Sequence, residues 1–281
     1  MRRFALAIGV LGLVAASCGG GETVEDTTTT AVTTTTSPTT TTIPVRTLVA
    51  PQASIVVDGS DGDWAAVEGL RLKMDSVHGV YGLDPAWVDV KVAHDDTHVF
   101  VLMRLDDDFN WDPDDPRLSA APSVAWAIDD MAGVAHGAGD TDRDASFGRT
   151  DIWQWKLACP SGTDAGGAAA GTVSDGGRDP ECSLDDLVAS TAYDDAPDSG
   201  ENSLLGAWSH TDPTEDAFGS YVFEFSRPLD TGDADDLQFS MGDVALLALA
   251  YWDPDNGPDG WEPDLHVVSS YEGWIEVTLV P

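Results

Sequence analysis

Residues Val88–Ala93 (VDVKVA) and Val99–Leu105 (VFVLMRL) stand on either side of Asp95-Asp96-Thr97. Side chains alternate between the two faces of an extended strand. One face of the second run therefore carries four apolar side chains, Val99, Val101, Met103 and Leu105. The polar residues between the two runs favour a turn. This stretch predicts a β-hairpin with one buried face.

Similar short apolar runs recur along the chain, separated by Asp, Gly and Pro. In Tyr221–Phe225 (YVFEF) the three aromatic side chains share one face and Glu224 points to the other. Helical periodicity is limited to a turn or two near Leu184–Ser190. The other runs that we expect to be strands are Ser123–Ile128, Asp151–Leu157, Val244–Trp252 and Trp274–Val280. Many short strands with polar turns predict an all-β fold, a β-sandwich with long loops.

The N-terminus predicts a lipoprotein signal peptide over residues 1–17. A basic start, Met1–Arg3, is followed by the apolar stretch Phe4–Ala16 and by small residues before Cys18. Cys18 stands where a lipoprotein cysteine is acylated, although Ala15 occupies the position usually held by leucine. A plain secretory signal is the alternative. We expect lipidation at Cys18, hence an extracytoplasmic cell-envelope protein that is lipid-anchored to the membrane.

Residues 18–47 predict a flexible, disordered stalk. Thr27–Thr42 is almost pure threonine, and such a segment cannot bury a core. The remaining residues, 48–281, are enough for one substantial all-β domain.

The charge balance excludes one class of partner. The chain has 50 acidic and 13 basic residues and a formal net charge of −37. Nothing in it could neutralise phosphates, so we expect no nucleic-acid partner. Solubility in a salty or GC-rich host is a simpler explanation of the acidity than a specific cationic partner.

The segment 160–220 is rich in Gly, Ala, Asp and Ser, so we expect a long excursion from one end of the sandwich. Cys159 and Cys182 enclose part of it. If Cys18 is lipidated, Cys159 and Cys182 are the two cysteines that remain, and an exported domain lies in an oxidising compartment. We therefore expect a disulfide between Cys159 and Cys182.

Three stretches carry a family resemblance when taken in order: Ile55–Gly59 (IVVDG) with Asp63-Trp64, Asp151–Lys156 (DIWQWK) and Phe223–Leu229 (FEFSRPL). They resemble the haem-binding domain of the ethylbenzene dehydrogenase γ-subunit and cytochrome c-552 family. That family is related in shape to family 9 carbohydrate-binding modules and DOMON domains. The resemblance covers most of residues 50–281. It implies an immunoglobulin-like β-sandwich that binds one haem b and exchanges electrons with a redox partner protein.

The haem ligands of that family do not carry over. They are a lysine and a methionine, and the methionine lies just upstream of the strand that matches DIWQWK. Here that upstream stretch is Ser146–Gly148, which contains no methionine, and no lysine follows Lys156. Because haem iron accepts imidazole or thioether ligands, Met131, His136 and His210 become the cofactor-binding candidates. The alternative, which we favour for each, is a core or loop methionine and solvated histidines.

Trp153 and Trp155 lie two apart on one expected strand and so project to the same face. A haem or a sugar could stack there, but paired tryptophans are more often sandwich core. We expect three further histidines of the domain, His94, His98 and His266, at the surface.

A calcium site is a second possibility at one acidic stretch. Asp140, Asp142, Asp144 and Asp151 place oxygen ligands at positions 1, 3, 5 and 12 of a calcium loop. Ala145 replaces the glycine of that loop. Chance spacing in so acidic a chain is the favoured alternative.

The chain contains no GxSxG, HExxH, P-loop or dinucleotide-binding pattern, so we do not expect an enzyme in its own right. The leading hypothesis is an extracytoplasmic lipoprotein with a haem-binding, electron-transfer domain. The alternative is a non-catalytic carbohydrate or cell-surface binding module of similar fold, with calcium as a stabilising ion. A structural lipoprotein without a small ligand is the third hypothesis.

Overall fold

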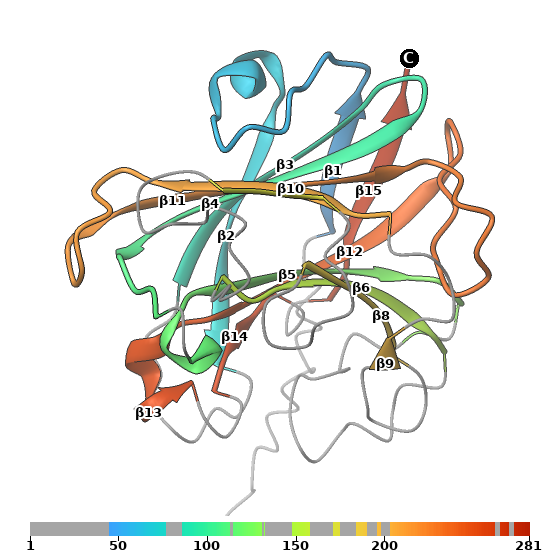
Figure 1. Cartoon of the computed structure of the whole chain (residues 1–281). Coiled ribbons are helices and arrows are strands. Elements are labelled where there is room, and N and C mark those ends of the chain that lie inside the picture. Colours follow the sequence, from blue (N-terminus) through green and yellow to red (C-terminus); the bar gives the residue numbers. More distant parts are fainter. Residues whose placement is uncertain are drawn as a thin grey trace, which may run out of the picture. The chain divides into compact units, whose positions relative to one another are not determined.

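The computed structural model describes residues 45–76, 86–112, 115–130, 132, 148–157, 171–174, 184–189, 196–197, 203–261, 265–269 and 273–281. All of them belong to one compact unit, Ile43–Pro281. This unit is built from β-strands and a few short 3-10 turns (Figure 1). Within the described ranges, no helix has the length and apolar character needed to cross a membrane.

Two antiparallel sheets face each other (Figure 1). The first has the strand order β7 (Gly171–Ser174), β10 (Leu205–His210), β11 (Phe218–Pro228), β4 (His98–Asp108), β3 (Ala86–His94) and β2 (Gly69–Ser76). The second has the order β14 (Val267–Val268), β12 (Val244–Trp252), β5 (Ala121–Ala127), β6 (Thr150–Trp155), β8 (Leu184–Ala189) and β9 (Ala196–Pro197).

The two sheets are connected, because β14 pairs with both β12 and β2. On the same edge of β12, β15 (Ile275–Val280) pairs antiparallel with β12 and parallel with β1 (Arg46–Pro51). The remaining short elements are η1 (Gly62–Ala66), η2 (Pro116–Leu118), η4 (Pro254–Asn256) and β13 (Pro258–Trp261). The expected all-β sandwich is confirmed.

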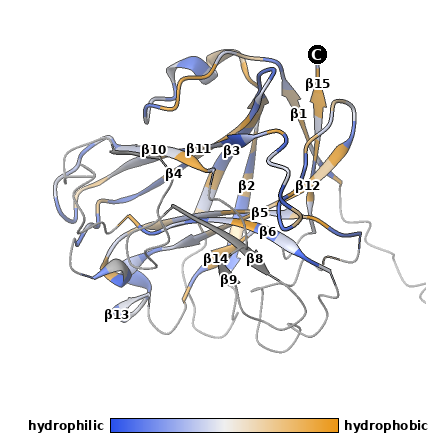
Figure 2. Cartoon of the chain, turned by 45° about the vertical axis from the view of Figure 1, so that its right-hand side comes forward, coloured by the Kyte–Doolittle hydropathy of each residue, from blue (hydrophilic) through white to orange (hydrophobic). Residues whose placement is uncertain are grey.

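The core lies between the sheets and follows the alternation of the sequence. The four side chains expected on the inner face of β4 are all buried, Val99, Val101, Met103 and Leu105. The β3–β4 pairing opposes His94 to Val99, which confirms the predicted hairpin. Each buried side chain of this size contributes roughly 1.5–3 kcal/mol of transfer free energy. Figure 2 shows the resulting pattern, with apolar residues along strands such as β15 and hydrophilic residues in many turns.

A second apolar cluster covers the outer face of the first sheet. Residues 53–67 run across this face rather than forming a strand over Ile55–Gly59, and they bury Trp64 against it. Glu224 points to this face, as expected, yet it is fully buried. Its carboxylate accepts hydrogen bonds from Trp64 Nε1 at 2.7 Å and from the backbone N–H groups of Asp58 and Gly59 at 2.9 and 2.6 Å. Trp64 therefore anchors this segment on the outer face of the sheet.

Gly59 is required by this arrangement. Its φ is +79°, a left-handed conformation that favours glycine. A Cβ at this position would lie 2.8 Å from the carbonyl oxygen of Trp208. The Gly59 turn therefore packs directly on β10, where Ser209 Oγ also donates to the Gly59 carbonyl at 2.6 Å.

Two expectations about the middle of the chain were wrong. The turn of helix expected near Leu184–Ser190 is the strand β8. The excursion expected over 160–220 contains β7, β8, β9 and the start of β11, and it supplies β10 to the first sheet. Pairing with β11 along six residues and burial of Trp208 incorporate β10 into the sandwich. Cys18, Cys159 and Cys182 lie outside the described residues, so the lipid anchor and the disulfide stay predictions.

Candidate functional site

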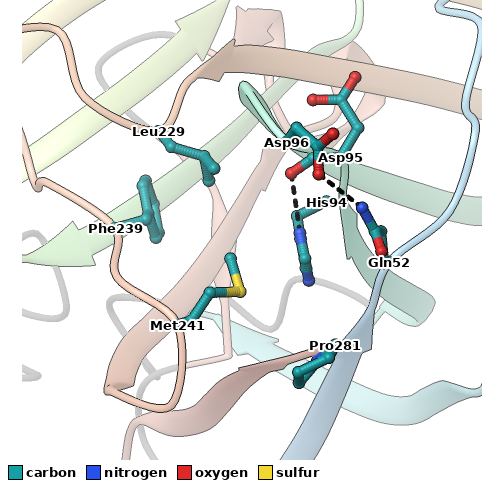
Figure 3. A pocket seen from close by; sticks show the side chains of 8 residues that line it. All are labelled: Gln52, His94, Asp95, Asp96, Leu229, Phe239, Met241 and Pro281. Carbon is teal, nitrogen blue, oxygen red and sulfur yellow. Dashed lines mark hydrogen bonds between the residues drawn. The ribbon is translucent and has the colours of Figure 1, made fainter.

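One pocket opens where the β3–β4 turn, the end of β1 and the connection from β11 to β12 meet. Its volume is about 330 Å³. Figure 3 shows Leu229, Phe239 and Met241 on one side and Gln52, His94 and Asp96 on the other; Asp95 and Pro281 complete the lining. The pocket therefore has an apolar wall and a polar wall, the combination typical of small-molecule sites.

The polar wall is held by hydrogen bonds between segments far apart in sequence. Gln52 Nε2 donates to Asp96 Oδ1 at 2.7 Å, which connects the end of β1 to the β3–β4 turn (Figure 3). His94 is 2% exposed, and its Nδ1 and Nε2 lie 2.9 Å from the carbonyl oxygens of Asp95 and Val280. The expectation of a surface position was wrong for His94. Its ring ties the turn to β15.

Asp95 shapes the turn beside the pocket. Its Oδ1 accepts hydrogen bonds from the Thr97 N–H at 2.7 Å, the Thr97 hydroxyl at 2.9 Å and the His98 N–H at 2.7 Å. Burial acts to raise the pKa of Asp95, but these hydrogen bonds outweigh it and hold the pKa below its usual value. The carboxylate is therefore ionised at neutral pH. The His98 side chain is 43% exposed, which agrees with the expected surface position.

The apolar wall combines two fixed side chains with one adaptable side chain. Phe239 packs edge-on against Trp126, with ring centroids 5.0 Å apart, and its N–H donates to the Leu229 carbonyl at 2.8 Å. The Leu229 N–H in turn donates to the Thr97 carbonyl at 2.8 Å. Met241 is 46% exposed at the pocket edge, where its flexible thioether can adapt to a ligand.

A buried ion network lies behind this wall. The Arg227 guanidinium is 2.7 Å from Asp151 Oδ2 and 2.8 Å from Asp236 Oδ1, and all three side chains are buried. Burial raises the pKa of Asp151, and the nearby Arg227 opposes that rise. Arg227 also donates to the Leu237 carbonyl at 2.8 Å, and the Leu237 N–H donates to Asp151 at 2.9 Å. These contacts hold in place the segment that contains Phe239, which lines the pocket.

His210 is buried, so the expectation that it is solvated was wrong. Its Nε2 lies 3.2 Å from the carbonyl oxygen of Asp107, and the Asp212 N–H donates to Nδ1 at 3.2 Å. The ring also packs on Tyr221, with centroids 4.4 Å apart. Both nitrogens are engaged by the protein, so His210 does not fit the role of an iron ligand.

Trp153 and Trp155 both point into the core, and the favoured interpretation is confirmed. The Arg227 guanidinium lies over the Trp153 ring at 5.0 Å, and Trp155 packs edge-on against Phe225. A ligand cannot stack on either ring without displacing the core. The other haem candidates, Met131 and His136, lie outside the described residues.

The proposed calcium loop fails at its twelfth position. Asp151 is buried and paired with Arg227, so its carboxylate is not available to a loop at the surface. Asp140, Asp142 and Asp144 lie outside the described residues. In the part of the chain that the structure describes, no three His, Cys, Asp or Glu side chains are grouped closely enough to hold a metal ion.

A different titratable site lies at the far end of β4 and β12. Burial raises the pKa of Asp107 to about 8, and repulsion from Asp253 and Asp108 adds to this effect. Tyr251 donates its hydroxyl hydrogen to Asp107 Oδ2 at 2.7 Å. His266, which we expected at the surface, is also buried at this end.

Comparison with known proteins gives a likeness in structure only. No protein-family model matches the chain, and no curated protein matches it. Two similar solved structures are of a family 9 carbohydrate-binding module from Caldicellulosiruptor kristjanssonii, in complex with glucose (12% identity, TM-score 0.44) and with cellotriose (12%, 0.43). They cover 83% of this chain and 95% and 94% of the module. A candidate carbohydrate-binding protein from Bacteroides uniformis ATCC 8492 has 10% identity and a TM-score of 0.44, covering 83% of this chain and 99% of its own.

The likeness to family 9 modules is one of shape, as the sequence resemblance implied. These structures do not support the ethylbenzene dehydrogenase resemblance. The haem-binding, cytochrome-like prediction is therefore wrong, since its only described histidine candidate is hydrogen-bonded on both nitrogens and its tryptophans are core. The predicted electron-transfer role depended on that haem and is wrong for the same reason.

Proposed function

We propose that the domain, which begins with β1 at Arg46 rather than at the expected residue 48, is a non-catalytic module that binds a carbohydrate in the pocket between the β3–β4 turn and the segment before β12. The observation that carries the proposal is the two-sided lining. Leu229, Phe239 and Met241 offer an apolar wall, and Asp96 and Gln52 offer hydrogen-bonding groups opposite. A sugar ring has C–H groups on its faces and hydroxyl groups at its edges, so it matches both walls.

The size of the pocket limits the ligand. Its volume of about 330 Å³ lies near the lower end of the ~300–1,000 Å³ found for small-molecule sites. One sugar unit at the end of a chain, or a free monosaccharide, fits this space better than the middle of a long polymer.

Titration of the purified domain with mono- and oligosaccharides by calorimetry tests the proposal. Asp96→Ala removes an exposed carboxylate from the pocket, and we expect about tenfold weaker binding because a charged hydrogen bond is worth ~1.5–3 kcal/mol. Met241→Ala should weaken binding by a smaller factor, since only part of its 46% exposed side chain would contact a sugar.

Trp87→Ala is the matched control. Trp87 is 52% exposed and is the kind of aromatic platform that a sugar could use, but it stands at the other end of β3 from His94. At ~3.4 Å per residue the two positions are roughly 23 Å apart. Binding should be unchanged in this variant. Loss of binding in Trp87→Ala, with none in Asp96→Ala, would place the site elsewhere and refute the proposal.

We also propose that Cys18 carries a lipid anchor and that the residues between it and β1, 19–45, hold the domain away from the outer surface of a membrane. The support is the signal-peptide pattern before Cys18 and the threonine-rich segment after it. Cys18→Ala should move the protein from the membrane to the soluble fraction on ultracentrifugation. Retention of this variant in the membrane would overturn the anchor.

A further inference from the structure

The pocket carries an excess of acidic groups. Asp95 and Asp96 both line it, and among the lining residues that the structure describes there is no lysine or arginine. The one basic side chain of the lining, His94, already has a backbone carbonyl 2.9 Å from each ring nitrogen. A ligand in this pocket therefore meets carboxylates without a compensating cation.

The hydrogen-bonding groups of the lining are mostly acceptors. Asp95 and Asp96 each use Oδ1 within the protein, whereas their Oδ2 atoms have no hydrogen-bond partner among the residues that the structure describes. Gln52 spends one N–H on Asp96 and keeps its carbonyl oxygen. Acceptors and negative charge together select a ligand that presents donors, and a protonated amine supplies both donors and the opposite charge.

The charge of the whole chain acts in the same direction. A formal net charge of −37 attracts cationic ligands to the surface and repels anionic ones. A uronic acid would place a third carboxylate next to Asp95 and Asp96. The described lining offers no lysine or arginine to offset the repulsion between these carboxylates.

We infer that the pocket selects an amine-bearing sugar, of the glucosamine class, over neutral, N-acetylated and acidic sugars. This inference rests on the proposed carbohydrate function and narrows it to one substrate class. The apolar wall of Leu229, Phe239 and Met241 receives the ring face, and the acidic turn receives the ammonium group.

Calorimetry with the full domain at about pH 6, where an amino sugar is protonated, tests the inference. The probes are glucosamine, glucose, N-acetylglucosamine, glucuronate and cyclohexylamine. Glucosamine should bind about fivefold tighter than glucose, which is the upper value for one exposed ion pair. In about 0.5 M sodium chloride this preference should shrink, because salt screens exposed charges.

Two matched variants remove one negative charge each. Asp96→Asn should abolish the preference for glucosamine over glucose. Asp259→Asn, on β13, should leave it intact, since this strand lies away from the β3–β4 turn (Figure 1).

The outcomes separate the two proposals. Equal affinity for glucose, N-acetylglucosamine and glucosamine would overturn the amine preference and leave carbohydrate binding standing. Cyclohexylamine binding as tightly as glucosamine, with glucose not binding, would overturn the carbohydrate function and the sugar class, leaving only a charge-selective pocket. Tighter binding of glucuronate than of glucosamine would also refute the inference.

Discussion

Replacing Arg227 by methionine should destabilise the domain more than any surface change. Arg227 is fully buried, with Asp151 Oδ2 at 2.7 Å and Asp236 Oδ1 at 2.8 Å, so its removal leaves two buried carboxylates without their cation. Breaking one buried pair in this way costs ~3–5 kcal/mol. For a domain of this size, ~1 kcal/mol shifts Tm by ~2–4 °C, so we expect a fall in Tm of about 6–20 °C.

Thermal unfolding followed by near-ultraviolet circular dichroism measures this loss directly, because Trp153 lies under the guanidinium at 5.0 Å. The loss should shrink as the pH falls toward 4, since burial raises the pKa of Asp151 and this carboxyl can then take up a proton instead of remaining an unpaired buried charge. The matched control adds Asp151→Asn and Asp236→Asn to Arg227→Met, which removes the unpaired charges. If this triple variant is no more stable than the single variant, or if the single variant loses less than about 1 kcal/mol, the buried-charge argument is wrong.

Three further predictions concern other buried or reactive groups. Glu224→Gln replaces one of the two acceptor oxygens by an NH2 group, which then faces N–H donors. The free energy of unfolding should fall by ~1.5–3 kcal/mol in denaturant titrations, and an unchanged midpoint would contradict the role of Glu224. The raised pKa of Asp107 means that the folded state holds its proton up to about pH 8, so stability should fall as pH rises from about 4 to 8. Asp107→Asn should flatten that decline in Tm-against-pH curves, and an equally steep curve would contradict it. Thiol labelling of the denatured, unreduced protein should find Cys159 and Cys182 blocked, whereas two reactive thiols would exclude the disulfide.

The strands that the sequence predicted best are those with a regular apolar alternation and a clear turn on each side. Val244–Trp252 was expected as a strand, and β12 has these bounds. The sequence of β2 carries the same signal, since Leu70, Leu72 and Met74 alternate with polar residues. β14 has only two residues and no local signal, because it exists through pairing with β12 and β2.

The pocket could not be predicted from local patterns. Its lining comes from the end of β1, the β3–β4 turn, the connection from β11 to β12 and Pro281, and none of these segments contains a binding motif. Only the register of the sheets brings them together. The histidines show the same limit, because the burial of His94 depends on a carbonyl of Val280 that lies far away in sequence.

The three stretches that suggested a haem family have a structural explanation. The IVVDG and DW residues meet the glutamate of FEFSRPL, where Trp64 and the Gly59 backbone donate to Glu224. The aspartate of DIWQWK meets the arginine of the same FEFSRPL stretch, through Asp151 and Arg227. One strand, β11, thus connects both buried polar clusters on its opposite faces. Residues that meet in this way hold the sandwich together, so their pattern indicated the fold correctly and carried no information about a ligand.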